Sequence, residues 1–205
     1  MKKMKLLVFI AALVLAVGAG HLALAGTFSD IDDDQVEQAV ETLYHLDIVD
    51  GYGDGNFYPD QALTRAQFCK LVVLAMGKAD EVDAYAHMTR FSDVPSTHWA
   101  AGYVNLATSL GIINGYGDGT FGPADIINYG QAVTILLRVL GYTTADIGYY
   151  WPSDYVSFAA KIGLDCDLGL SAADSVSRGD AAIIIVQMMN TDDTKGDTYT
   201  STAYA

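Results

Sequence analysis

A ten-residue segment rich in glycine occurs twice in this chain, and it constrains the fold more than any other feature. The first copy spans residues 49–58 (VDGYGDGNFY), and the second spans residues 113–122 (INGYGDGTFG). A Phe-Ser-Asp tripeptide precedes both copies, at 28–30 and 91–93, and a proline follows both. A period of about 64 residues predicts an array of one small unit, so comparing the copies can reveal function.

Each unit has the pattern of a helix, a glycine-rich turn and a second helix. Apolar residues at helical spacing predict first helices at about 33–46 and 97–110, and second helices at 64–76, 128–140 and 177–190. A third unit is degraded, because Trp151 aligns with Trp99 but the glycine-rich turn has become residues 165–170. One short helix pair cannot bury its apolar face alone, so we expect the three units to pack together in a mainly α fold.

The start of the chain has the pattern of an export signal. Three lysines precede an apolar run, and Ala23-Leu24-Ala25 follows as a cleavage signature. The run is short for a membrane span, so we expect cleavage after Ala25 and no transmembrane segment in the mature chain. The expected order is a signal peptide at 1–25, units at 26–78, 91–142 and 143–190, a linker at 79–90 that can hold a short helix, and a disordered tail at 191–205.

Charge and motifs argue against several function classes. Removing the three leading lysines takes the formal net charge from −14 to −17, and no basic patch remains, so nucleic acid is not an expected partner. The chain has no phosphate loop and no G-x-S-x-G or H-E-x-x-H motif, so we expect neither an enzyme nor a bound cofactor. Asp54 and Asp118 stand alone among glycines, without the distal Glu of a calcium loop, so no metal site is expected. The sequence leaves open whether Cys69 and Cys166 pair, although free thiols are slightly favoured.

The second helix of every unit begins with a capping-box pattern, formed by Thr64 with Gln67, Asn128 with Gln131, and Ser177 with Asp180. Arg65 and Arg178 follow the cap, where a cation faces the positive end of the helix dipole at a cost of about 0.3–1 kcal/mol. Tyr129 stands there in the second unit, so the fold does not require arginine.

Two interpretations of these arginines stay open. Each guanidinium can join the cap hydroxyl and the free helix N–H groups in binding a carboxylate or phosphate. Alternatively, each forms a structural ion pair with an aspartate such as Asp30 or Asp93. The tryptophans have two interpretations as well. Trp99 and Trp151 can pack into the core, or they can offer an aromatic face to a sugar ring.

Three segments resemble the S-layer homology (SLH) domain: residues 91–100 (FSDVPSTHWA), residues 111–121 (GIINGYGDGTF) and residues 64–67 (TRAQ). The resemblance covers nearly all of the mature chain as three tandem domains. It implies three helix–turn–helix repeats that form a pseudo-threefold spindle around a central three-helix bundle, with grooves between neighbouring repeats.

The resemblance also implies a location and a ligand. Such domains attach exported proteins non-covalently to the cell wall, at the cell surface or in an S-layer. The expected partner is a secondary cell-wall polysaccharide or another peptidoglycan-linked polymer. In many Gram-positive members its terminal sugar carries a pyruvate ketal, which places a carboxylate beside a sugar ring. The alternative is a structural envelope protein whose SLH domains contact other envelope proteins and bind little glycan.

The resemblance further implies the ligand-binding residues, which are Arg65, Arg178, Asp30, Asp93, Trp99, Trp151, Gly111 and Gly163. No unit keeps the full set. Gln35 and Asp47 replace the tryptophan and the glycine in the first unit, Tyr129 replaces the arginine in the second, and Asp146 matches the aspartate only loosely in the third. We therefore expect at most two competent grooves, with the groove that relies on Tyr129 weak or dead. The glycine-rich turn is interpreted as a hinge that sets each helix pair, with the ligand contacts lying downstream of it.

Overall fold

The computed structural model describes residues 27–191, and within this range it is mainly helical. The expected signal peptide at 1–25 and the expected tail beyond residue 191 lie outside the described residues. Only isolated β-bridges, and no strands, occur in the described range. No helix in the described part is long and apolar enough to cross a membrane.

Six of the helices are the first and second helices of the three sequence units. The first helices are α2 (Asp34–His45), α5 (Ala101–Ser109) and α8 (Ser153–Lys161), and the second helices are α3 (Arg65–Ala75), α6 (Tyr129–Val139) and α9 (Arg178–Asn190). The predicted helices are confirmed to within a few residues. The largest difference is at α5, which begins four residues later than expected, because residues 95–101 form turns in which His98 N donates to Pro95 O and Ala101 N donates to His98 O.

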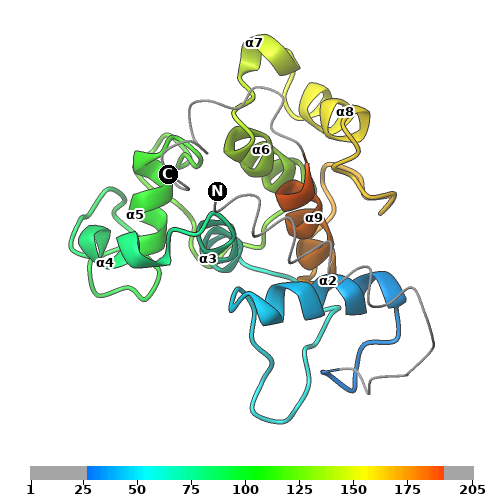
Figure 1. Cartoon of the computed structure of the whole chain (residues 1–205). Coiled ribbons are helices and arrows are strands. Elements are labelled where there is room, and N and C mark those ends of the chain that lie inside the picture. The colour runs from blue at the N-terminus through cyan, green and yellow to red at the C-terminus, as the bar shows by residue number, and fades with distance from the viewer. Residues whose placement is uncertain (1–26, 192–205) are drawn as a thin grey trace, which may run out of the picture.

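The first helices of the second and third units pack against the second helix of the preceding unit, and the first helix of the first unit packs against the second helix of the last unit. Helix α5 contacts α3, α8 contacts α6, and α2 contacts α9. Figure 1 shows α3, α6 and α9 at the centre of the molecule, with α2, α5 and α8 outside them. Eight of the eleven residues of α6 are buried, and six of the nine residues of α5 are buried as well. The core is therefore shared among all three units.

A ring of backbone hydrogen bonds joins the segments that lead into the three second helices. Leu63 N donates to Val176 O at 3.0 Å, Val176 N donates to Ile127 O at 3.1 Å, and Ile127 N donates to Leu63 O at 3.0 Å. All three side chains are buried. The ring gathers the N-termini of α3, α6 and α9 at one place and so positions the residues at the helix starts.

The segment between the first two units is packed against the fold. It contains the 3-10 helix η1 (Ala79–Glu81) and helix α4 (Val82–Tyr85). A further short helix, α7 (Thr144–Ile147), lies elsewhere, just before α8. The Nδ2 atom of Asn105 on α5 donates to the carbonyl oxygens of Tyr85 and Met88. A Cβ on Gly102 would lie 2.6 Å from the carbonyl oxygen of Val82, so only glycine allows α4 to approach α5 this closely.

Candidate functional site

The helix N–H groups expected to help bind an anion are already used by the protein. The first two N–H groups of α3 donate to Asp125 O and Pro123 O, and those of α9 donate to Gln61 O and Pro59 O. The third N–H group of each helix donates to its capping side chain, as the capping boxes predicted. The prediction that free helix N–H groups complete an anion site is therefore wrong, because the turn of a neighbouring unit occupies them.

Arg65 lies against the glycine-rich turn of the second unit. Its Nε donates to Phe121 O at 2.9 Å, and its Nη2 donates to Asn114 O at 3.4 Å. The guanidinium carbon lies 4.7 Å from the centre of the Tyr116 ring and 4.6 Å from that of Phe121. The residue is only 7% exposed. Arg65 thus joins the first helix pair to the turn of the next unit.

Arg178 makes the same contacts with the turn of the first unit. Its Nε donates to Phe57 O at 2.8 Å and its Nη2 to Asp50 O at 3.0 Å. The guanidinium carbon lies 5.1 Å from the Tyr52 ring centre and 4.2 Å from the Phe57 ring centre. Arg178 is partly exposed, unlike Arg65. Each arginine therefore pairs with a turn that is remote in sequence, and the turn is half of the arginine's environment rather than only a hinge.

Tyr129, at the position of the missing arginine, has lost this arrangement together with its turn. Its N–H donates to Asp174 O in the third unit, whose glycine-rich turn is degraded. The side chain is 2% exposed, and its hydroxyl has no hydrogen-bond partner among residues 27–191. Burial raises the pKa of Tyr129 to about 12, helped by the nearby Asp165 and Cys166. The two arginines thus face the two intact turns, and the tyrosine faces the altered one.

Asp30 and Asp93 hold the ends of the turns in place. Asp30 accepts the N–H groups of Phe57 and Tyr58, and Asp93 accepts those of Phe121 and Gly122. Neither forms an ion pair with an arginine within the described residues, where the ion pair found is Lys78 with Glu81. The ion-pair interpretation of Arg65 and Arg178 is therefore wrong. The aspartates act on the arginines indirectly, by shaping the turn whose carbonyl groups accept from them.

Electrostatics around the two arginines follows from their burial. Desolvation lowers the pKa of Arg65, while Tyr116, Asp125 and Asp93 oppose this shift. Desolvation also lowers the pKa of Arg178, and Tyr52, Asp30 and Asp50 oppose it. Both groups remain cations at neutral pH, because arginine titrates far above it. Each is therefore a fixed positive charge in a strongly acidic chain.

The tryptophans lie at the starts of the first helices with about half of their surface exposed. Trp99 is 56% exposed and stacks on His98, with ring centres 5.7 Å apart. Trp151 is 53% exposed, and its indole N–H donates to the Thr134 hydroxyl on α6 at 3.0 Å. Neither is a core residue, so both leave an aromatic face open.

The two glycines of the predicted site end the first helices in the left-handed conformation. Gly111 has φ 72° and Gly163 has φ 73°, while Asp47 adopts φ 58° at the equivalent place. Asp54 and Asp118, inside the glycine-rich turns, accept the N–H groups of Asn56 and Thr120. This bonding of Asp to its own turn matches the interpretation of these residues as turn formers.

Sequence reasoning missed the aromatic residues that surround the arginines. Tyr52, Phe57, Tyr116 and Phe121 all belong to the repeated ten-residue segment. The signal was present in the sequence, because the segment keeps its tyrosine and phenylalanine in the two units that contain it. The sequence did not show which arginine would contact each turn.

Comparison with known proteins places two of these segments in a family. Residues 27–69 and 90–133 match the model of the S-layer homology domain. The chain is 38% identical over 90% of its length to a "Cell surface protein" of Thermoanaerobacter kivui, covering 24% of that protein. It is 36% identical over 80% of its length to the "Middle cell wall protein" of Brevibacillus brevis, covering 16% of it. A "Cellulosome-anchoring protein" of Acetivibrio thermocellus is 31% identical over 52% of the chain, which covers 24% of that protein.

The chain thus spans about a quarter or less of the length of these curated relatives. The matched family segments contain both intact turns, together with Arg65 and the aspartates Asp30 and Asp93. Residues 27–69 and 90–133 are therefore two S-layer homology repeats.

Proposed function

We propose that this chain attaches non-covalently to the bacterial cell wall by binding a secondary wall polysaccharide in grooves between its repeats. The observation that carries the proposal is the pairing of arginines with turns. Arg65 and Arg178 stand against local helix preference, and each meets an intact glycine-rich turn. Where the arginine is lost, at Tyr129, the facing turn is lost too. Relatives named for the cell surface, the cell wall and cellulosome anchoring support the same role.

We further propose that helices α8 and α9 form a third, degenerate repeat, and that the three repeats make a pseudo-threefold spindle around α3, α6 and α9. The cyclic backbone bonds among Leu63, Ile127 and Val176 support this arrangement. The cyclic order of the helix contacts supports it as well, because α5 packs on α3, α8 packs on α6, and α2 of the first unit packs on α9 of the last. The residue ranges 26–78, 91–142 and 143–190 remain the proposed domain limits.

The grooves suit an anionic sugar on chemical grounds. A guanidinium has five N–H donors, and the turn carbonyls accept from the Nε and Nη2 atoms of each arginine. The remaining donors can bind a carboxylate, such as that of a pyruvate ketal, in a chain that otherwise repels anions. Trp99 offers its exposed face beside α3, because α5 packs on that helix. We propose binding by these groups without catalysis.

Sedimentation with purified cell walls tests this function. The chain should sediment with walls that retain their secondary polymer and stay in solution with walls stripped of it. A free ketal-pyruvylated sugar should release the bound protein, whereas the same sugar without the ketal should release much less. Equal sedimentation with both wall preparations would rule out the secondary polymer as the ligand.

A second candidate function is assembly with other envelope proteins. The observation that favours it is an exposed aromatic pair before α8, where Tyr149 is 81% exposed and Tyr150 is 77% exposed. Solvent-facing aromatic side chains are frequent at protein interfaces. Replacing both tyrosines with serine should change self-association in sedimentation velocity, and leave wall binding intact, if this surface serves assembly.

A further inference from the structure

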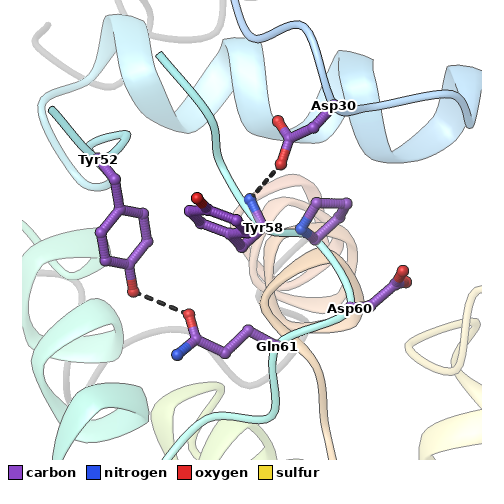
Figure 2. Close-up of a pocket in the computed structure, with 6 residues that line it drawn as sticks. Asp30, Tyr52, Tyr58, Asp60 and Gln61 are labelled. Carbon is purple, nitrogen blue, oxygen red and sulfur yellow. Dashed lines mark hydrogen bonds between the residues drawn. The ribbon is translucent and has the colours of Figure 1, made fainter. Parts of the chain in front are cut away.

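The first repeat carries a pocket near Arg178. Among the predicted site residues, only Asp30 lines it. It has a volume of about 600 Å³ and is lined by Asp30, Tyr52, Tyr58, Pro59, Asp60 and Gln61. Figure 2 shows Tyr52, Tyr58 and Gln61 around one side of this pocket, while Asp60 points away from them. The ring of Tyr52 also contacts the Arg178 guanidinium. Tyr52 therefore borders both the pocket and Arg178.

Tyr58 adopts a backbone conformation that tyrosine disfavours. Its φ is 59°, and the equivalent residue of the second repeat is Gly122, with φ 71°. A bulky side chain in this left-handed region is strained, and such strain persists where the residue has a role. The core does not need this ring, because Tyr58 is 42% exposed. Its position against backbone preference points to a function at the surface.

The two tyrosine rings are held in fixed positions. Their centres lie 5.1 Å apart in an edge-to-face arrangement. The Tyr52 hydroxyl donates to Gln61 Oε1 at 2.8 Å, and the Tyr58 hydroxyl donates to the Asp54 carboxylate. Gln61 Nε2 has no acceptor among residues 27–191, so its N–H groups face solvent. The pocket thus combines fixed aromatic faces with free amide donors, which is the composition of a small-ligand site.

The second repeat has closed the equivalent space. Asp125 stands where the first repeat has Gln61, and its carboxylate accepts from the Tyr116 hydroxyl at 2.8 Å. A Cβ on Gly122 would lie 2.3 Å from the Asp125 carboxylate and 2.6 Å from the Tyr116 ring. No side chain fits there without moving both groups. The aromatic pair is therefore a feature of the first repeat and not of the shared fold.

The groove at Arg178 lacks the tryptophan that the other first helices supply. Helix α2, which packs on α9, has Gln35 at the place of Trp99 and Trp151. The start of α2 reaches the start of α9, because a Cβ on Gly179 would lie 3.2 Å from Val36. The tyrosine pair provides an aromatic surface in the one groove where the tryptophan is missing.

The charge of the pocket indicates the ligand class. Carboxylates of Asp30 and Asp60 line it, and no basic side chain does. An anionic sugar would meet repulsion here, so the anion belongs on the Arg178 side of the Tyr52 ring. An uncharged pyranose can place its apolar C–H face on a tyrosine ring and its hydroxyl groups near the Gln61 amide.

We propose that Tyr52, Tyr58 and Gln61 form a subsite for an uncharged pyranose, next to the anion site at Arg178. The subsite rests on the wall attachment proposed above and specifies what one groove recognises. It takes the sugar that neighbours the charged residue of a wall polysaccharide. The first repeat then contributes a neutral-sugar contact that the second repeat cannot make.

Calorimetric titration with two pools of wall oligosaccharide tests this subsite. Oligosaccharides released from purified walls are separated on an anion exchanger into a neutral pool and an acidic pool. The full chain should bind the neutral pool, and Tyr58→Gly should bind it at least about tenfold more weakly, because the aromatic face is gone. Tyr58→Gly restores the residue type that the second repeat uses, so it suits the backbone, and Tyr58→Asn provides a second variant that tolerates this conformation.

The control is Arg90→Ala, which removes an exposed side chain that does not line the pocket and should leave binding of the neutral pool unchanged. The proposal is overturned if the native chain does not bind the neutral pool, or if both Tyr58 variants bind it as tightly as the native chain. The two proposals fail separately. Wall sedimentation that persists without neutral-sugar binding removes only the subsite, while neutral-sugar binding without wall sedimentation removes only the attachment function.

Discussion

The guanidinium of Arg65 lies 4.6 Å from the centre of the Phe121 ring, and its Nε donates to the carbonyl oxygen of the same residue at 2.9 Å. Arg178 and Phe57 repeat this relationship at 4.2 Å and 2.8 Å. One side chain thus stacks on a turn residue and also bonds its backbone. The arginine therefore ties one repeat to the turn of another repeat.

Arg65→Ala should destabilise the fold by about 2–4 kcal/mol, because it leaves the carbonyl groups of Phe121 and Asn114 without a buried donor. Arg178→Ala should cost less, about 1–2 kcal/mol, because water can reach this partly exposed site. Urea unfolding followed by circular dichroism measures both. Arg90→Ala is the control, since Arg90 makes an exposed bond to Ser109 and its loss should change stability by less than about 0.5 kcal/mol. Equal losses for all three variants would contradict the tie between repeats.

Tyr129→Phe should leave the free energy of unfolding unchanged or raise it by about 1 kcal/mol, because the buried hydroxyl has no partner in the described part of the chain. Tyr129→Arg should not rebuild a groove. It places a cation in a 2% exposed position facing an altered turn, so it should destabilise the protein by several kcal/mol. Thermal unfolding of the two variants checks this contrast. A stability gain for Tyr129→Arg would show that the third turn can still accept an arginine.

Asp47→Gly should stabilise the chain by about 0.5–1 kcal/mol, because glycine adopts the left-handed conformation without a side-chain penalty. Asp47 has φ 58°, and the equivalent residues of the other units are Gly111 and Gly163 at 72° and 73°. The reverse change, Gly111→Asp, should cost a similar amount. A shift of the urea midpoint in the same direction for both variants would be inconsistent with the backbone argument.

Cys69 and Cys166 are both free thiols. Burial raises the pKa of Cys69 to about 12 and that of Cys166 to about 11. The folded chain should therefore react slowly with a thiol reagent at pH 8, and both thiols should react once it is unfolded. Because both pKa values are raised, their contribution to stability is complete below the ordinary thiol pKa near 9 and is lost as the pH rises through the folded values. An unfolded, non-reduced chain with no reactive thiol would instead reveal a disulfide.

Features that depend on local sequence were predictable. The helix caps at Thr64, Asn128 and Ser177, and the turn roles of Asp54 and Asp118, follow from residues within a few positions of each other. Each of these predictions is confirmed by hydrogen bonds in the structure.

Features that depend on contacts between repeats were not predictable. The sequence shows two arginines at helix starts and two glycine-rich turns, but not that Arg178 contacts a turn more than a hundred residues earlier in the chain. The same long-range contacts also occupy the helix N–H groups that the sequence analysis predicted to be free. The sequence aligns Tyr58 with Gly122, but only the structure shows that both residues are left-handed.

Wall sedimentation of arginine variants tests the central claim most directly. Purified walls are titrated with the native chain, with Arg178→Ala, with the double variant Arg65→Ala and Arg178→Ala, and with Tyr129→Phe, after circular dichroism has shown that each is folded. The account predicts that Arg178→Ala weakens binding, that the double variant loses at least about 90% of it, and that Tyr129→Phe binds like the native chain. A folded double variant that sediments as strongly as the native chain would contradict the account.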